Sequence, residues 1–363
     1  METLKVTPLT EWHKAHDAKM APFAGYDMPI QYTKILTEHE QTRTKAGVFD
    51  ICHMGEFLIS GENAAQALGK VVTHNLTTLM PGRCRYGFLL NPEGGILDDL
   101  IIYCLEQDRY MLVVNAARTA LDYDWLKKHL PEHITLEDIS DQTAKIDLQG
   151  PRSYAVLTSV LGQNIELKYF NFTTLSYEGE NLLVSRTGYT GELGFEFYLP
   201  VSKALGLWEA LIAHNDVEPV GLGARDTLRL EMGLPLYGQD LDEHHTPSEA
   251  GMTWLPASDA DYVGKSQSST IRQRLVPLVI EGRRSARHHD AVKDASDNTV
   301  GVVTSGSFAP SLGHVVALAY INADAADQDA FFIEASRTKL EAKKTELPFY
   351  KKGTARIKLE DAQ

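Results

Sequence analysis

The chain alternates between segments with helical hydrophobic spacing and short apolar runs that are typical of strands. Helical spacing is found at residues 33–47, 62–72 and 116–130. Between the last two segments lie three strand-like runs, RYGFLLN, GILDDLIIYCL and DRYMLVVN. Because the turns that join these runs are too short for parallel crossovers, we predict an antiparallel meander.

After residue 140 the pattern restarts with the strand-like AKIDLQG and changes again near residue 266. Further helices are predicted at residues 151–162, 202–215 and 223–234. Beyond residue 266 the short runs RLVPLVIEG, TVGVVTSG, HVVALAYI and AFFIEA are parted by polar turns, which is typical of a small β-barrel. Residues 283–298 are polar and predict a solvated loop.

Length, charge and cysteine content narrow the class of protein. A chain of 363 residues is too long for one hydrophobic core, so several domains are expected. The formal net charge of -14 argues against a protein that binds nucleic acid or an anionic membrane. Three cysteines without a CxxC pair predict neither disulfides nor a metal site, and no targeting segment or membrane-spanning run is visible. We therefore expect a cytoplasmic protein.

Two adjacent carboxylates, Asp98 and Asp99, interrupt the apolar run GGILDDLIIY. A buried carboxylate without a partner is costly, so a strand should not carry one without a reason. Strand alternation sends the two side chains to opposite faces, with Asp98 on the face of Ile96 and Leu100. At most one of them can serve a given pocket. From spacing alone, the favoured interpretation is that one caps the Gly-Gly turn and the other lies on a solvated sheet edge.

Two later stretches also concentrate unusual residues. RTGYTGELGFEFYL holds three glycines within seven residues, which indicates tight turns or a close backbone approach, and places Glu196 between two phenylalanines. A charge held among aromatic rings is either salt-bridged or offered to a ligand. In GARDTLRLE, Arg225 and Arg229 lie four residues apart on one side of a predicted helix. Together they could bind a carboxylate of a ligand, although spacing alone favours pairing with Asp226 and Glu231 in the same helix.

Taken together, seven motifs resemble those of the aminomethyltransferase of the glycine cleavage system, the T-protein family. They are FAGYDMPIQY, FDICHMGEF, GGILDDLIIY, GYTGELGFE, GLGARDTLRLEMGLPLYGQD, VTSGSFAPSLG and ELPFY. The motifs follow the family's order from about residue 7 to the tail, and GARDTLRLE followed by LYGQD is the most specific.

The resemblance implies an α+β fold, a three-domain cloverleaf with antiparallel sheets. Residues 1–265 would form two interleaved folate-binding domains, split near residues 50 and 140, and residues 266–363 a C-terminal β-barrel domain. It also implies that the enzyme takes an aminomethyl group from the lipoyl arm of the H-protein. Tetrahydrofolate would be the one-carbon acceptor, with release of ammonia and formation of 5,10-methylenetetrahydrofolate. Neither a metal, nor nucleic acid, nor a membrane is expected to take part.

The resemblance assigns roles to individual residues. Asp99 matches the family's catalytic aspartate, which leaves Asp98 a structural role. In the implied reaction N(5) of the folate attacks the aminomethyl carbon and N(10) then closes the ring. An anion beside N(10) could orient it, stabilise the cation or receive its proton, and these three roles stay open. Glu196 matches the residue that binds the pterin. The other implied folate contacts are Met54, Tyr86, Val113, Asn115, Tyr189, Arg225, Trp254 and Arg356.

The chain also departs from the family pattern. Tyr26 stands where tryptophan is common, a polar WLPASDADYVGK replaces an apolar strand, and ARHHDAV interrupts a motif of the third domain. These changes bear on the third domain and on H-protein docking more than on Asp99 or Glu196. Three alternatives therefore remain: a tetrahydrofolate-dependent demethylase or methyltransferase with another one-carbon donor, a non-catalytic folate-binding protein of the same fold, and a scaffold that has lost activity.

Overall fold

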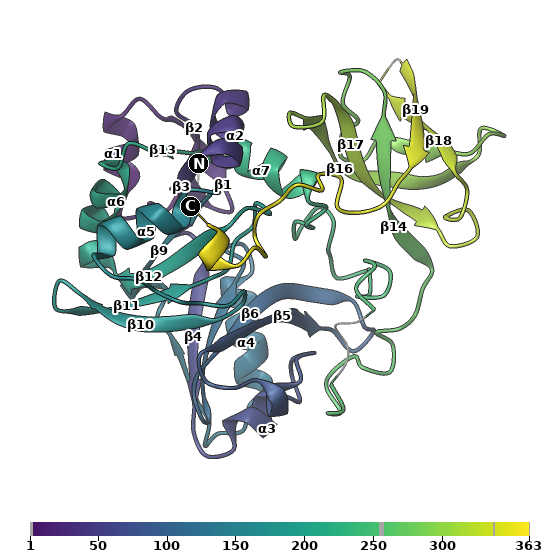
Figure 1. Ribbon diagram of the computed structural model, residues 1–363. Helices are drawn as coiled ribbons and strands as arrows, with labels where there is room; N and C mark the ends of the chain where they lie inside the picture. The colour runs from purple at the N-terminus through teal and green to yellow at the C-terminus, as the bar shows by residue number, and fades with distance from the viewer. Residues whose placement is uncertain (1–2, 254–257, 337, 363) are drawn as a thin grey trace.

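The computed structural model describes residues 3–253, 258–336 and 338–362. Its ribbon has three lobes: a first lobe that contains both chain ends, a second lobe below it, and a barrel beside them (Figure 1). Strands and helices alternate irregularly through the first two lobes, and the described residues of the barrel, from β14 to β19, form strands and turns. The expected α+β class, the three-lobed arrangement and the C-terminal barrel are confirmed.

A six-stranded sheet, here called the first sheet, forms the centre of the first lobe. In spatial order its strands are β10 (Phe172–Tyr177), β11 (Glu180–Ser185), β12 (Gly194–Pro200), β9 (Thr143–Gln149), β3 (Ala46–Asp50) and β13 (Val217–Pro219). In this sheet β13 and β3 pair in parallel, and the other neighbouring strands pair antiparallel. The helices of this lobe are α1 (Thr10–Ala15), α2 (Ile35–Thr44), α5 (Ser153–Leu161), α6 (Ala204–Ile212) and α7 (Leu222–Glu231), and a hairpin, β1 (Lys19–Phe23) with β2 (Tyr26–Gln31), completes it.

A five-stranded antiparallel sheet, here called the second sheet, forms the second lobe. Its spatial order is β5 (Arg83–Leu90), β6 (Ile96–Glu106), β7 (Arg109–Val114), β4 (Gly55–Ser60) and β8 (Thr135–Asp138). Helices α3 (Ala64–Leu68) and α4 (Thr119–His129) belong to it. The predicted meander is confirmed by the antiparallel pairing of β5 with β6 and of β6 with β7. The chain changes sheets between β3 and β4 and again between β8 and β9.

The third lobe is a closed barrel of six strands. Around the barrel they follow the order β14 (Gln273–Ile280), β17 (His314–Asn322), β16 (Thr299–Ala309), β15 (Ala291–Lys293), β18 (Ala330–Ala335) and β19 (Thr338–Lys344). The sequence predicted four of them. It missed β15, inside the segment expected to be a loop, because that strand has only three residues. It missed β19 because TKLEAKK carries no apolar run and buries a single alanine in the barrel.

Each lobe has its own hydrophobic core, and a further cluster joins the two sheets. In this joining cluster Tyr103 of β6 packs with Tyr198 of β12, and their hydroxyls lie 2.9 Å apart. Tyr103 also lies 3.1 Å from the hydroxyl of Ser185 on β11. The faces of the two sheets that meet at this cluster also carry the polar residues of the site.

The segment after β19 leaves the barrel and returns to the first lobe, as the yellow end of the chain shows (Figure 1). There the guanidinium of Arg43 in α2 lies 4.3 Å from the ring centroid of Tyr350. Thr354 donates a hydrogen bond of 2.5 Å to Glu192, and the amide of Ala355 donates to Gly191 at 3.0 Å. The barrel is therefore connected to the first lobe by the chain that enters it and by the chain that leaves it.

Candidate active site

Asp99 lies on β6, an inner strand of the second sheet, with part of its surface exposed. Its Oδ2 accepts a hydrogen bond of 2.9 Å from the hydroxyl of Tyr86 on β5, and its Oδ1 accepts one of 2.8 Å from the amide of Asn115, just after β7. Burial raises the pKa of Asp99 to about 6, although both hydrogen bonds act in the opposite direction. Neighbouring strands thus bring together three residues that the resemblance assigned to one site.

Asp98 points to the other face of β6 and is completely buried. It accepts hydrogen bonds from Asn115, at 3.0 Å from the backbone amide and 2.8 Å from the side chain. Burial and the neighbouring Asp122 raise the pKa of Asp98 well above its usual value, while burial raises that of Asp122 to about 7. The side-chain amide of Asn115 donates to both Asp98 and Asp99 and so connects the two side chains.

The interpretation of this pair from spacing alone was wrong. β6 lies inside the sheet, so neither aspartate is on an edge, and Asp98 bonds Asn115 rather than capping the Gly-Gly turn. The alternation also breaks at Leu97, where the register with β5 shifts by one residue. This bulge moves Ile96 away from the face of Asp98, and it packs with Phe88 instead.

Glu196 lies on β12 of the first sheet and is almost completely buried. Its Oε1 lies 3.1 Å from Nζ of Lys145, and its Oε2 accepts a hydrogen bond from Thr187. Burial alone would raise the pKa of Glu196, but Lys145, Thr187 and the nearby Arg225 outweigh that effect and hold the pKa below its usual value. The Lys145 ammonium also lies 3.3 Å from the sulfur of Met54.

Arg225 projects from α7 towards the same face of the first sheet and is partly exposed. Its Nη1 lies 2.5 Å from Oδ2 of Asp147, the residue opposite Glu196 in the strand register. Burial raises the pKa of Asp147 to about 6, with Arg225 acting against it. The expected pairing of Arg225 within its own helix was wrong, because β9 supplies a closer carboxylate.

The second arginine of that helix, Arg229, behaves differently. It pairs with Asp226 at 2.9 Å, as expected, and with Asp240 at 2.7 Å. Glu231, the other expected partner, pairs instead with Arg43 at 2.9 Å. Arg229 and Glu231 are therefore parts of the scaffold under the site.

Tyr189 is the next residue that the resemblance assigned to the folate site. Its hydroxyl donates to the carbonyl of Pro235, and the Arg225 guanidinium lies 5.2 Å from its ring centroid. Burial raises the pKa of Tyr189, and the charge of Asp99 raises it further.

The remaining residues named by the resemblance lie at differing depths. Val113 of β7 is buried in the cluster that joins the two sheets. Arg356 is exposed in the returning tail, with its guanidinium 5.4 Å from the ring centroid of Tyr169. Trp254 lies outside the described residues.

Sequence reasoning missed Lys145 and Asp147. They alternate along AKIDLQG with Ala144, Ile146 and Leu148, which belong to the core of the first lobe. Lys145 and Asp147 therefore point to the opposite face, although both are buried. The sequence did contain a signal for them: both are charged and stand at alternate positions of an otherwise apolar strand. Because buried charges need partners, such a pattern indicates a polar site on that face.

The glycines of GYTGELG confirm the expected close backbone approach. A Cβ on Gly188 or Gly194 would lie 2.1 Å or 2.0 Å from the amide group of Gln149. Gln149 donates hydrogen bonds to Asp147 at 2.6 Å and to the Thr187 carbonyl at 3.0 Å. These two glycines thus leave room for the amide that orients the polar residues around Glu196.

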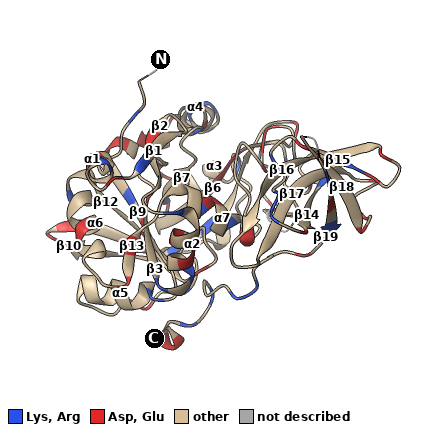
Figure 2. Ribbon diagram, turned by 90° about the horizontal axis from the view of Figure 1, so that it is seen from above, with Lys and Arg blue, Asp and Glu red and all other residues tan. Residues whose placement is uncertain are grey.

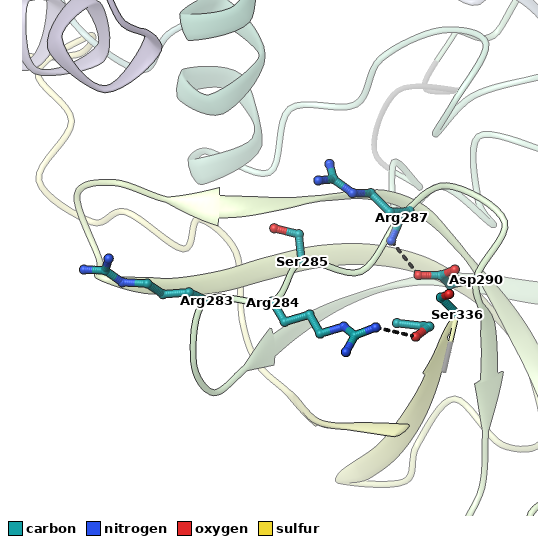
Figure 3. Close-up of a pocket in the computed structure, with 7 residues that line it drawn as sticks. Arg283, Arg284, Ser285, Arg287, Asp290 and Ser336 are labelled. Atoms are coloured by element: carbon teal, nitrogen blue, oxygen red, sulfur yellow. Dashed lines mark hydrogen bonds between the residues drawn. The ribbon is translucent and has the colours of Figure 1, made fainter. Parts of the chain in front are cut away.

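Two surface hollows lie elsewhere, on the barrel. One of about 390 Å³ is shown in Figure 3, where the side chains of Arg283, Arg284 and Arg287 extend from one segment. Arg284 donates a hydrogen bond of 3.3 Å to the carbonyl of Ala335, which also lines it. None of the site residues described above lines either hollow. Within the described ranges, no group of three or more His, Cys, Asp or Glu side chains is arranged to hold a metal ion.

Comparison with known proteins places this arrangement in a family. The family model "GCVT N-terminal domain" matches residues 9–259, and "Glycine cleavage T-protein C-terminal barrel domain" matches residues 273–351. An aminomethyltransferase of Halothermothrix orenii is 43% identical over 89% of this chain and 93% of its own length. One of Picosynechococcus sp. is 42% identical over 96% of this chain and 99% of its own.

A solved structure agrees with the sequence matches. The glycine cleavage system aminomethyltransferase T of Bartonella henselae superimposes with a TM-score of 0.92 at 34% identity, covering 97% of this chain and 99% of its own. Fold and site thus define an enzyme of the aminomethyltransferase class. The chain belongs to the glycine cleavage T-protein family.

Proposed function

We propose that the enzyme transfers the aminomethyl carbon from the lipoyl arm of the H-protein to tetrahydrofolate. Ammonia leaves, the lipoyl thiol is released, and 5,10-methylenetetrahydrofolate forms. One observation carries the assignment of the acid. Asp99 is partly exposed, both its oxygens accept hydrogen bonds, and its pKa is about 6. It is thus largely ionised at neutral pH and still basic enough to accept a proton.

The residues around Asp99 fit a folate. A pterin presents its 2-amino group and N(3)–H side by side, and the carboxylate of Glu196 supplies two acceptor oxygens. The folate's glutamate carries carboxylates, and Arg225 offers a partly exposed guanidinium whose other nitrogens are free of the Asp147 contact made by Nη1. Tyr86, Tyr189 and Met54 would supply apolar walls.

In this proposal Asp99 acts on the proton of N(10). Tyr86 and Asn115 hold the carboxylate in one orientation, so it needs no rearrangement when positive charge develops beside it. As the ring closes, N(10) loses its proton and Asp99 receives it. Asn115 donates to both Asp98 and Asp99, so the buried Asp98 holds its amide in place beside Asp99.

The proposal extends to partner and compartment. The lipoylated H-protein would deliver the aminomethyl group, and neither nucleic acid nor a membrane would take part. Lys and Arg positions are interspersed with Asp and Glu positions along the ribbon (Figure 2). All three cysteines are free and buried, which supports a reducing, cytoplasmic setting. Among the described residues, no helix is long and apolar enough to cross a membrane.

The test compares the wild type with Asp99→Asn. Ammonia release and methylenetetrahydrofolate formation would be measured with aminomethylated H-protein, and tetrahydrofolate binding by calorimetry. We expect turnover to fall by roughly 10²–10³, the usual loss when one preorganised electrostatic group is removed, with folate binding retained. Asp124→Asn on the exposed side of α4 is the matched control and should behave as wild type. Folate binding by the wild type without turnover would refute the H-protein as donor.

A further inference from the structure

Lys145 is a buried ammonium in the wall of the candidate active site. Its side chain is 2% exposed, and Nζ lies 3.1 Å from Glu196 Oε1. The same nitrogen lies 3.3 Å from the Met54 sulfur and 5.3 Å from the ring centroid of Tyr198. A buried charge is costly unless it is paired and hydrogen-bonded. The proposed reaction gives this lysine no role.

The hydrogen-bond capacity of Lys145 is not used up by its neighbours. An ammonium has three N–H donors, and a thioether is only a weak acceptor. One donor faces the Glu196 carboxylate and another faces the sulfur of Met54. Among the described residues, no third side-chain or backbone acceptor is bonded to Nζ. At least one donor therefore remains for a ligand.

Glu196 and Lys145 place hydrogen-bond acceptors and a donor side by side in the candidate site. Glu196 supplies acceptor oxygens, and Lys145 supplies a donor directly beside them. The edge of a pterin has the complementary order: the 2-amino group and N(3)–H are donors, and the adjacent O(4) is an acceptor. A carboxylate alone could satisfy the two donors but would leave O(4) facing no donor.

We infer that Lys145 is a substrate-binding residue that donates a hydrogen bond to O(4) of the pterin, next to the contacts made by Glu196. This inference rests on the proposed use of tetrahydrofolate. It assigns the lysine to recognition of one atom of the substrate. If Lys145 only neutralised Glu196, the nature of the atom at position 4 would not matter to it.

The experiment changes that single atom. Tetrahydrofolate and its 4-thioxo analogue share the 2-amino group and N(3)–H, but sulfur is a much weaker acceptor than oxygen. Calorimetry would give Kd for both ligands with the wild type, Lys145→Met and Lys70→Met. Lys70 is an exposed lysine outside the site and serves as the control.

We expect the wild type and Lys70→Met to prefer the 4-oxo ligand by roughly tenfold, as for loss of a hydrogen bond to a charged donor. In Lys145→Met the two ligands should bind within about threefold of each other. Lys145→Met leaves the Glu196 charge buried without its counter-ion, so Lys145→Met with Glu196→Gln is measured as well. It keeps the wall neutral and should show the same loss of preference.

The outcomes separate this inference from the function on which it rests. If Lys145→Met, or Lys145→Met with Glu196→Gln, retains the wild-type preference while binding tetrahydrofolate, Lys145 does not contact O(4) and the inference is overturned. If the wild type has no preference, the inference also fails and the proposed function stands. If the wild type binds neither ligand, the proposed use of tetrahydrofolate is wrong.

Discussion

Replacing Arg43 with methionine should destabilise the protein more than any surface change, because this arginine connects three parts of the structure. It lies in α2 with 6% of its side chain exposed. Nη1 lies 2.8 Å from Glu192 in the loop before β12, and Nη2 lies 2.9 Å from Glu231 at the end of α7. The returning tail contacts it through the ring of Tyr350.

The size of the stability loss follows from the two carboxylates that Arg43→Met leaves without their partner. Both carboxylates are buried, and removing one partner of a buried ion pair typically costs about 3–5 kcal/mol. Glu231 retains the Ser311 amide at 2.8 Å and His39 at 3.3 Å, and Glu192 retains Thr354. These remaining contacts favour the lower end, so we expect a loss of about 3 kcal/mol.

Urea unfolding followed by circular dichroism would measure this loss at pH 7. The double variant Arg43→Met, Glu231→Gln is the control, because it removes one of the two orphaned charges. It should recover about 1–2 kcal/mol relative to Arg43→Met, the cost of leaving one polar group unsatisfied. A loss below about 1 kcal/mol in Arg43→Met would mean that the pairs contribute no more than a surface salt bridge, and the reasoning would fail.

The contacts of Arg43 and Glu231 should also affect how the stability of the protein depends on pH. Burial would raise the pKa of Glu231, but hydrogen bonding and charge from His39, with Arg43 adding to them, hold it below its usual value. A lowered folded-state pKa stabilises the protein above the unfolded-state pKa of 4.5 and loses that contribution as the pH falls. In Arg43→Met the folded pKa of Glu231 rises, so less stability remains to be lost with acid.

Three further predictions concern activity and stability. The kcat/KM should fall below about pH 6 as Asp99 is protonated, and Tyr86→Phe should move that limb upward, because the Tyr86 hydrogen bond lowers the pKa of Asp99; an unmoved limb would contradict this assignment. Gly188→Ala should lower the free energy of unfolding by about 1–3 kcal/mol in urea titrations, since its Cβ would displace Gln149; unchanged stability would contradict the close approach. The pKa of Glu249 is about 2 against 4.5 unfolded, so Glu249→Gln should flatten the loss of stability between about pH 4.5 and 2, and a slope like that of wild type would refute the role of this carboxylate.

The elements that the sequence predicted best were those whose pattern is local. The meander β5–β6–β7 follows from apolar runs joined by short turns. Helix α3 was predicted over residues 62–72 and covers only Ala64–Leu68, because the apolar spacing continues into a segment of tighter turns, in which Lys70 bonds Ala67 and Val71 bonds Leu68. Strand β19 has almost no apolar signal, and its partners β14 and β18 define it. Strand pairing between distant segments is not encoded in local spacing.

The site shows the same limit. Resemblance named Asp99, Tyr86 and Asn115, and adjacent strands bring them together. The partner of Arg225 was predicted wrongly, because its nearest carboxylate lies 78 positions away in the chain. Helical spacing describes only neighbours in the same helix. Charges that meet across a strand and a helix require the tertiary structure, and so did the contact of Lys145 with Glu196.

The two connections of the barrel have a mechanical consequence. The barrel packs on α7, where Leu230 shares a cluster with Val316 and Leu318 of β17, and the returning tail adds a second connection at a separate point of the first lobe. Here the second attachment is fixed by Thr354 on Glu192 and by Ala355 on Gly191, in the loop that also holds Gly188 and Thr187. A displacement of the barrel would therefore reach the backbone beside Glu196 through the tail as well as through α7. Cutting the chain within the tail would remove this connection and leave the barrel held by its packing on α7 and by the chain that enters it.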